Sequence, residues 1–399
     1  MSKKTPQIRF KGFTDDWEER KLGDVVGEIQ SGNRLPKDSL TNGDVPYVVA
    51  QTKNDGVFKK IARGTLDYNG NPMKLFPGNS ISFSIDNPEA MFYRNAEFYT
   101  SNIMRVIHED HLTHEQYVFI LENMKRFIRG YDWSRKFSGP VVSNLEYLQP
   151  SEEEQQKIGS FFKQLDDTIA LHQRKLDLLK EQKKGFLQKM FPKNGAKVPE
   201  LRFSGFADDW EERKLGEHSN ILTGGTPKTS MSNYWNPKEI PWMSSGEVNK
   251  RRLNETDNMI SKEGLENSSA RWVKENSIVI ALAGQGKTRG TVAVNNIPLT
   301  TNQSIAAIEP YETLNFEFIF QNLSKRYDEL RMMSSGDGTR GGLNKKIIYD
   351  IIITAPILEE QQKIGSFFKQ LDDTIVLHQR KLDLLKEQKK GFLQKMFVS

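Results

Sequence analysis

The sequence contains no cysteine, which excludes disulfide bonds and thiol catalysis and is typical of a reducing compartment. No apolar run approaches the roughly 18 residues of a membrane-spanning helix. The polar start, MSKKTPQIRF, lacks the apolar core of a signal peptide. Together these absences predict a soluble, cytoplasmic protein.

Common catalytic motifs are also missing. The sequence has no GxGxxG, HExxH or GxSxG pattern. Two adjacent prolines occur nowhere, so the Asn/Asp-Pro-Pro-aromatic motif of amino-methyltransferases is absent. We therefore expect no catalytic residue in this chain and no cofactor bound to it.

One segment loosely matches a Walker A phosphate loop. Residues 281–288, ALAGQGKT, follow a strand-like run, but a phosphate loop must open into a helix. The next residues, RGTVAVNN, are rich in β-branched side chains and favour a hairpin. Nucleotide binding, as in an ATPase, remains the alternative. The hairpin would display Gln285, Lys287, Thr288 and Arg289.

Three histidines lie close together, at His108, His111 and His114, beside acidic residues. They straddle a predicted helix start instead of lining one helical face. The second half of the chain has no histidine at the equivalent place. A metal site is therefore an alternative that the spacing does not favour, and we expect none.

A block of 39 residues occurs twice, at 153–191 and 359–397, with one change from Ala170 to Val376. Apolar residues recur in it at steps of four and three, which is typical of the seam of a supercoiled helix. His172 and Lys183 interrupt this seam, and we interpret them as register-setting or snorkelling residues. The predicted seam residues are Ile158, Phe162, Leu165, Ile169, Leu176, Leu179 and Phe186, with Ile364, Phe368, Leu371, Ile375, Leu382, Leu385 and Phe392.

Each block predicts one long helix. Pro150 precedes the first block, and Ser151 with Glu154 predicts a capping box. At 1.5 Å per residue the helix would be about 58 Å long. Such a helix with a single apolar seam is unstable alone, so we expect the two copies to pair antiparallel about a pseudo-twofold axis. The pair would hold two globular units at opposite ends of a rod; a plain core helix is the alternative.

A second repeat precedes each globular unit. Residues 6–24 match residues 199–217, and both contain WEERKLG. A tryptophan at the start of each motif is interpreted as a packing residue, with direct ligand contact as the alternative.

The globular units repeat one plan in different residues. Strand-like runs at 45–50 and 79–85 correspond to runs at 240–245 and 276–283, and TSN at 100–102 corresponds to TTN at 300–302. Helices are predicted at about 114–129, capped by Thr113 with Gln116, and at about 316–331.

The predicted fold class is α+β. Two mixed α/β globular domains would be separated by two long antiparallel helices that form an intramolecular coiled coil. The predicted boundaries are 1–150 for the first domain, 151–191 for the first helix, 192–198 for a linker, 199–355 for the second domain and 356–399 for the second helix.

The two helices also agree at their outward positions, which a seam alone does not require. Recent duplication or gene conversion would explain this agreement. A partner surface presented twice would explain it too, with the globular units differing because they recognise different things.

Basic residues slightly outnumber acidic ones, 57 to 52, with a pI of about 9.0. Lysines and arginines, which can neutralise phosphates, gather in predicted loops of both units. Amides and hydroxyls, which can bond to base edges, lie in the same loops. This grouping indicates DNA binding. The candidates are Arg34, Lys37, Lys53, Asn54, Lys59, Lys60, Arg63 and Arg94 in the first unit, and Lys228, Ser244, Ser245, Asn249, Lys250, Arg251, Gln285, Lys287, Thr288, Arg289 and Arg340 in the second.

Taken in order, these motifs resemble the specificity subunit of type I restriction-modification systems. The resemblance rests on WEERKLG, GGTPK with IPWMSS, and GTRGGLN at 338–344 leading through a proline to EEQQKIG and the long helix. The first unit departs from the pattern, with SGNRLP at 31–36 and SGPVVSN at 138–144. No residue role is carried over there.

The resemblance implies a DNA-binding, non-catalytic subunit. Each globular unit would be a target recognition domain for one half of a bipartite double-stranded DNA site. The helix pair would set the gap and dock two methylation subunits, and restriction subunits would join them. S-adenosylmethionine, ATP and Mg²⁺ would belong to those partners. A coiled-coil adaptor that binds no nucleic acid is the competing hypothesis.

Overall fold

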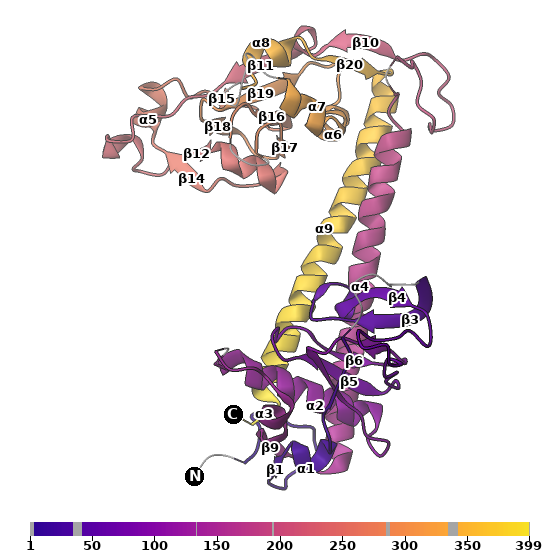
Figure 1. Ribbon diagram of the computed structural model, residues 1–399. Coiled ribbons are helices and arrows are strands. Elements are labelled where there is room, and N and C mark those ends of the chain that lie inside the picture. The colour runs from indigo at the N-terminus through magenta and orange to yellow at the C-terminus, as the bar shows by residue number, and fades with distance from the viewer. Residues whose placement is uncertain are drawn as a thin grey trace. The chain divides into compact units, whose positions relative to one another are not determined.

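The computed structural model describes residues 4–34, 42–132, 134–193, 195–284, 288–333 and 342–398 (Figure 1). The chain forms two compact units: unit 1, Met1–Arg174 with Arg380–Ser399, and unit 2, Lys175–Gln379. Each unit combines sheets with helices, so the predicted α+β class is confirmed. None of the helices in the described part of the chain combines the length and apolar character needed to cross a membrane.

Unit 1 contains three small sheets. Their strands, in sheet order, are β2 (Gln30–Ser31), β8 (Met104–Ile107), β5 (Ser80–Ser84) and β6 (Met91–Arg94); then β4 (Val57–Ile61), β3 (Asn42–Val48) and β7 (Tyr99–Thr100); then β1 (Glu18–Lys21) and β9 (Glu146–Gln149). The helices are α1 (Gly23–Val26), η1 (Lys53–Gly56), α2 (His114–Phe127), η2 (Ile128–Gly130) and α3 (Gly139–Ser143).

Unit 2 contains the corresponding sheets. Their strands are β11 (Ser219–Thr223), β19 (Ile305–Pro310), β16 (Ser277–Ala281), β17 (Val292–Asn295) and β13 (Arg252–Leu253); then β14 (Asn258–Ile260), β12 (Ile240–Met243), β18 (Leu299–Thr301) and β15 (Trp272–Val273); then β10 (Glu211–Lys214) and β20 (Ile352–Ala355). The helices are η3 (Leu215–Glu217), η4 (Ser232–Tyr234), η5 (Ser245–Lys250), α5 (Lys262–Glu266), α6 (Phe316–Lys325), α7 (Tyr327–Met332) and α8 (Lys345–Tyr349).

The register of the strands confirms that the two units share one plan. In unit 1, β3 pairs parallel with β7, and Tyr47 faces Tyr99. In unit 2, β12 pairs parallel with β18, and Trp242 faces Thr300. The predicted correspondence of 45–50 with 240–245 is therefore correct. The predicted correspondence of TSN with TTN is wrong by one residue, because the register makes Tyr99 the counterpart of Thr300 and Thr100 the counterpart of Thr301.

The loose Walker A segment lies in a hairpin. Strands β16 and β17 pair antiparallel, and Ile280 faces Val292. The described residues after the segment, from Thr288 on, lead into β17 and not into a helix, so the hairpin interpretation is confirmed and the phosphate-loop alternative is wrong.

Two long helices, α4 (Glu152–Lys189) and α9 (Leu358–Lys395), contribute to both units. In unit 1 the ring of Phe161 lies 4.9 Å from that of Phe392. In unit 2 the ring of Phe186 lies 5.1 Å from that of Phe367. Within each unit, early residues of one helix meet late residues of the other, so the two segments are antiparallel. None of the predicted seam residues is exposed.

The end of each long helix enters the core of a unit. Phe397 at the end of α9 stacks on Phe119 of α2, with ring centroids 5.4 Å apart, and Trp17 packs edge-on against the same ring. Phe191 after α4 packs against Phe318 in unit 2. Trp17 and its copy Trp210 are both buried, which confirms their interpretation as packing residues.

A buried ion pair joins each N-terminal repeat to the start of a long helix. Arg9 donates two hydrogen bonds to Glu154, at 2.7 and 2.8 Å, and Arg202 donates two to Glu360, both at 2.8 Å. The carboxylate raises the pKa of Arg9 through these bonds. The prediction that the Glu154 side chain completes a capping box is therefore wrong. The Glu154 backbone N–H does lie 3.4 Å from Ser151 Oγ, but the Glu154 carboxylate is taken by Arg9.

The lysine that interrupts the seam, Lys183 in one copy and Lys389 in the other, has different charged neighbours in the two units. Lys389 donates to the buried carboxylate of Glu122 at 2.9 Å and to Asp166 at 2.8 Å, and these contacts outweigh burial and raise its pKa. Lys183 pairs with Asp372, but burial lowers its pKa and the nearby Arg251 and Arg252 lower it further.

Replacing Lys389 by methionine should therefore cost more stability than replacing Lys183. The first change leaves Glu122 buried with one fewer cation and should cost about 3 kcal/mol. The second removes like-charge repulsion, and Asp372 keeps Gln321 at 3.0 Å, so we expect a cost of about 1 kcal/mol or less. Urea denaturation of both variants measures the difference, and equal losses would contradict it.

Glycines of the repeated block offer a second test of the packing. A Cβ at Gly159 would lie 1.9 Å from the Glu115 carbonyl oxygen, where α4 crosses the first turn of α2. A Cβ at Gly185 would meet nothing within 4 Å. Gly159→Ala should destabilise the protein by about 2 kcal/mol or more because backbone must move.

The matched control, Gly185→Ala, should stabilise by about 0.5–1 kcal/mol because alanine favours the helix. Thermal unfolding of the two variants compares them directly. A destabilised Gly185→Ala variant, or an unaffected Gly159→Ala variant, would show that this helix crossing is described wrongly.

Candidate nucleic-acid interface

Three stretches of unit 2 converge beside the β16–β17 hairpin. Asn249 and Arg251, at the end of η5, line a hollow of about 270 Å³ together with Gly290 and Thr291 at the start of β17. The Leu343 N–H donates to the Leu282 carbonyl at 3.0 Å, so the end of the GTRGGLN motif reaches the base of the same hairpin. The structure thus places the predicted Asn249 and Arg251 beside the two residues that follow the predicted Thr288 and Arg289 in the chain.

The predicted cations of this region differ in their partners. Lys250 donates to Asp257 at 2.6 Å and to Glu247 at 3.1 Å. Arg251 has a positive φ of 62°, and its guanidinium lies over the Phe320 ring, 5.0 Å from the centroid. Thr288 and Arg289 are half-buried in the hairpin.

Some of the predicted hydroxyl and amide side chains form hydrogen bonds within η5. The Ser244 side chain caps η5, and its hydroxyl lies 3.3 Å from Glu247 Oε1. Ser245 is half-buried. Asn249 donates to the Gly246 carbonyl at 2.9 Å but remains exposed. Asn249 is therefore the amide of this group that is best placed for an external contact.

The GGTPK motif packs on the second sheet of unit 2. The Gly225 N–H donates to Thr301 O at 2.9 Å, and Trp242 Nε1 donates to Gly225 O at 3.0 Å. A Cβ at Gly224 would lie 2.0 Å from Thr301 O, so only glycine fits there. This packing leaves Lys228 exposed at the end of the motif.

Unit 1 holds the corresponding loop in the same way. The Asn33 N–H donates to Thr100 O at 3.1 Å, which matches the contact of Gly225 with Thr301. Arg34 follows, and its guanidinium lies 4.8 Å from the centroid of the Tyr68 ring. Lys53 and Asn54 are exposed in η1.

Two exposed aromatic residues of unit 1 were not among the predicted site residues. Phe58 is 57% exposed on β4 beside Lys59 and Lys60, and Tyr68 is 58% exposed beneath Arg34. Exposed rings between cations are suited to nucleic acid. The run VFKKI carries the signal, because strand alternation turns Phe58 and Lys60 to the same face.

Several predicted placements in unit 1 need correction. Lys59 and Lys60 lie in strand β4 instead of a loop. Arg94 lies in β6 and is buried, where its Nε donates to Ser82 Oγ at 2.8 Å. Burial lowers the pKa of Arg94 to about 10. Arg63 is exposed but pairs with Glu97.

Four further candidates lie outside the described residues: Lys37, Gln285, Lys287 and Arg340. They remain predictions.

The three clustered histidines each contact neighbouring residues of unit 1. His108 Nδ1 lies 3.0 Å from Ser80 Oγ, and His111 Nδ1 lies 3.7 Å from Glu109 Oε2. The His114 ring packs 4.2 Å from that of Tyr93, and burial lowers its pKa. Within the described ranges, no three histidine, cysteine or carboxylate side chains are grouped as a metal site would require.

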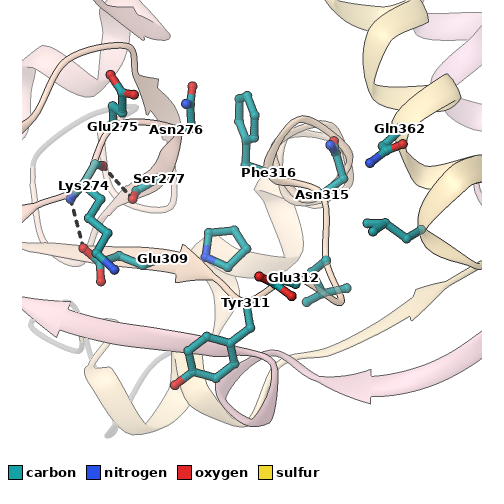
Figure 2. Close-up of a pocket in the computed structure, with 13 residues that line it drawn as sticks. Lys274, Glu275, Asn276, Ser277, Glu309, Tyr311, Glu312, Asn315, Phe316 and Gln362 are labelled. Carbon is teal, nitrogen blue, oxygen red and sulfur yellow. Dashed lines mark hydrogen bonds between the residues drawn. The ribbon is translucent and has the colours of Figure 1, made fainter.

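One cavity of unit 2 has the wrong charge for DNA (Figure 2). It measures about 570 Å³, and its lining includes Glu275, Glu309 and Glu312. Glu309 accepts the Lys274 backbone N–H at 3.0 Å and the Asn220 amide at 2.9 Å, so its carboxylate supports the sheet. An acidic hollow repels phosphates, so this cavity is not part of the candidate interface.

Two α+β units of one plan, which carry the predicted cations and amides and the exposed rings, define a duplicated two-domain class of protein. The sequence model of one family matches the chain twice, at residues 14–181 and 207–387. The chain therefore belongs to the family described as the type I restriction modification DNA specificity domain.

Named relatives are similar over different lengths. The chain is 26% identical to the EcoR124I/EcoR124II specificity subunit of Escherichia coli over 164 residues, which is 41% of each chain. It is 23% identical to the MjaVIII specificity subunit of Methanocaldococcus jannaschii, over 95% of this chain and 91% of that protein.

Solved structures share the fold. An S subunit of a type I restriction-modification system from M. genitalium matches with a TM-score of 0.68 and 14% identity, over 99% of both chains. A chain from a study of complex assembly and conformational transition of the type I R-M system matches with a TM-score of 0.52 and 19% identity, over 96% of this chain and 98% of that one.

Proposed function

We propose that this chain is the DNA-recognition subunit of a type I restriction-modification complex, and that each globular unit recognises one half of a bipartite site. The main support is that one fold plan occurs twice with different side chains at corresponding loops. Asn33 and Arg34 occupy the position in unit 1 that Gly225 and Thr226 occupy in unit 2, although the backbone contacts agree. A shared scaffold with unlike loops suits two different target sequences.

The long helices would set the gap between the half-sites. Two half-sites on one face of a duplex lie near one helical turn apart, about 34 Å. A helix pair with a regular seam is stiff enough to hold such a spacing, and a change in its length should change the gap. The proposed arrangement is pseudo-twofold, with the recognition domains at 1–150 and 199–355.

The outward surface of the helices would dock two methylation subunits, which restriction subunits then join. Each helix keeps two exposed leucines seven residues apart, Leu171 and Leu178 in one copy and Leu377 and Leu384 in the other. Exposed leucines retained in both copies favour a shared partner surface over a solvent face.

We also propose that the chain is not itself an enzyme. S-adenosylmethionine, ATP and Mg²⁺ would be bound by the partner subunits. The complex would act on cellular DNA in the cytoplasm. The absence of catalytic motifs from the sequence supports this assignment.

A coiled-coil adaptor without DNA binding is the competing function, and the family membership disfavours it. Filter binding of random duplex DNA across a salt series separates the two. A DNA-recognition subunit retains duplex at low salt and releases it as salt rises. An adaptor retains none.

Exchanging residues 199–355 for the corresponding unit of another specificity subunit should alter only one half of the methylated sequence. The unchanged unit would still select its own bases, because each unit has its own core. Sequencing of methylated adenines in cells that carry the hybrid measures the outcome. A change in both halves, or in neither, would contradict the assignment of one unit to each half-site.

Replacing Arg289 by alanine should weaken DNA binding. Loss of one phosphate contact lowers the slope of log affinity against log salt by about 1, whereas loss of a base contact relaxes one position of the site at about 1–3 kcal/mol. Lys274→Ala beside the acidic cavity is the matched control and should leave affinity unchanged. If the two variants behave alike, the hairpin does not face DNA.

A further inference from the structure

A second cavity of unit 2 is strongly cationic. It measures about 700 Å³ and lies between the last turns of α4, one turn of α9, helix α6 and the end of η5. Seven lysine or arginine side chains line it, against two carboxylates. The cavity is therefore built to attract an anion.

Internal ion pairs use only part of this positive charge. Lys183 pairs with Asp372, and Arg252 makes two hydrogen bonds to Glu317 at 2.6 and 2.9 Å. Among the described residues, no carboxylate forms an ion pair with Lys180, Lys184 or Arg251. Burial lowers the pKa of the Arg251 guanidinium, which means that its positive charge is disfavoured in the free protein. A bound anion would stabilise that charge.

The remaining wall is apolar. Leu187, Phe320, Ile375 and Val376 line it, and Arg251 and Arg252 lie over the Phe320 ring at 5.0 and 5.3 Å from its centroid. A DNA phosphate backbone would leave such a wall uncovered. A protein helix with an acidic edge and an apolar edge would satisfy both parts.

Unit 1 supplies an additional carboxylate to the central one of the corresponding lysines. Lys386, Lys389 and Lys390 are the sequence copies of Lys180, Lys183 and Lys184. In unit 1 the buried carboxylate of Glu122 accepts from Lys389 at 2.9 Å and from Lys125 at 2.9 Å. The corresponding α6 residue in unit 2 is the neutral Gln321, which bonds to Asp372. The carboxylate that offsets Lys389 in unit 1 is therefore missing beside Lys183 in unit 2.

We propose that the cationic cavity of unit 2 is a docking site for an acidic, amphipathic helix of a protein partner, and that the corresponding place in unit 1 is not. This proposal rests on the proposed function, because the partner to be tested is the methylation subunit. It implies that the first methylation subunit binds more tightly than the second.

The test measures binding of the methylation subunit of the same system to the full-length chain, without DNA, by isothermal titration calorimetry. The variant is Lys180→Glu with Lys184→Glu. Its matched control is Lys386→Glu with Lys390→Glu, the same two changes in the other copy of the helix. All four side chains are exposed, so both variants should fold.

We expect the tighter binding step to weaken by about tenfold or more in the variant, and by less than about threefold in the control. Equal weakening in both would overturn the proposed asymmetry. Unchanged partner binding with weaker, less salt-dependent DNA binding would assign the cavity to phosphates and overturn the proposal. If the unaltered chain binds DNA but no methylation subunit, the docking proposal fails alone; if it binds neither, the proposed function fails as well.

Discussion

The buried arginine–glutamate pair is the contact on which the rest of each unit depends. Glu154 and Glu360 have no exposed side-chain surface, and a lone carboxylate there would be costly. Arg9 and Arg202 come from segments far away in the sequence and satisfy both oxygens. The pair thereby ties the segment that precedes each WEERKLG tryptophan to the start of a long helix. This contact explains why each half of the chain keeps both the WEERKLG repeat and the long-helix repeat. The paired residues lie 145 residues apart in one half and 158 in the other.

The two copies of the repeated block are almost identical in sequence, but they lie in different surroundings. Lys183 and Lys389 occupy the same place in the repeated block, yet their pKa values move in opposite directions. Burial lowers the pKa of Lys183, and the nearby Arg251 and Arg252 lower it further, whereas at Lys389 the carboxylates of Glu122 and Asp166 outweigh burial. A duplicated element therefore acquires a distinct electrostatic character at each copy without any change of its own residues.

Much of the scaffold was predictable, because its signals are periodic or repeated. The seam spacing gave the two helices, and Thr113 with Gln116 gave the start of α2. Chemistry that depends on distant neighbours was not predictable. Arg94 resembles a loop cation in the sequence, but β6 lies against the core and buries it. Glu154 resembles a capping residue, and only the folded chain brings Arg9 to it. Phe58 and Tyr68 were missed because an isolated aromatic residue is usually buried.

The division between scaffold and loops also explains how such a protein can change its target without losing its assembly. Residues that cannot vary are held by sterics: a Cβ at Gly159 would strike the backbone of α2, and one at Gly224 would strike Thr301. Neither constraint reaches the hairpin between β16 and β17 or the exposed end of η5. Side chains there can change without disturbing the core, the buried ion pairs or the helix seam. Selection for a new DNA sequence can therefore act on such loops while the glycine contacts, the ion pairs and the helix seam stay unchanged.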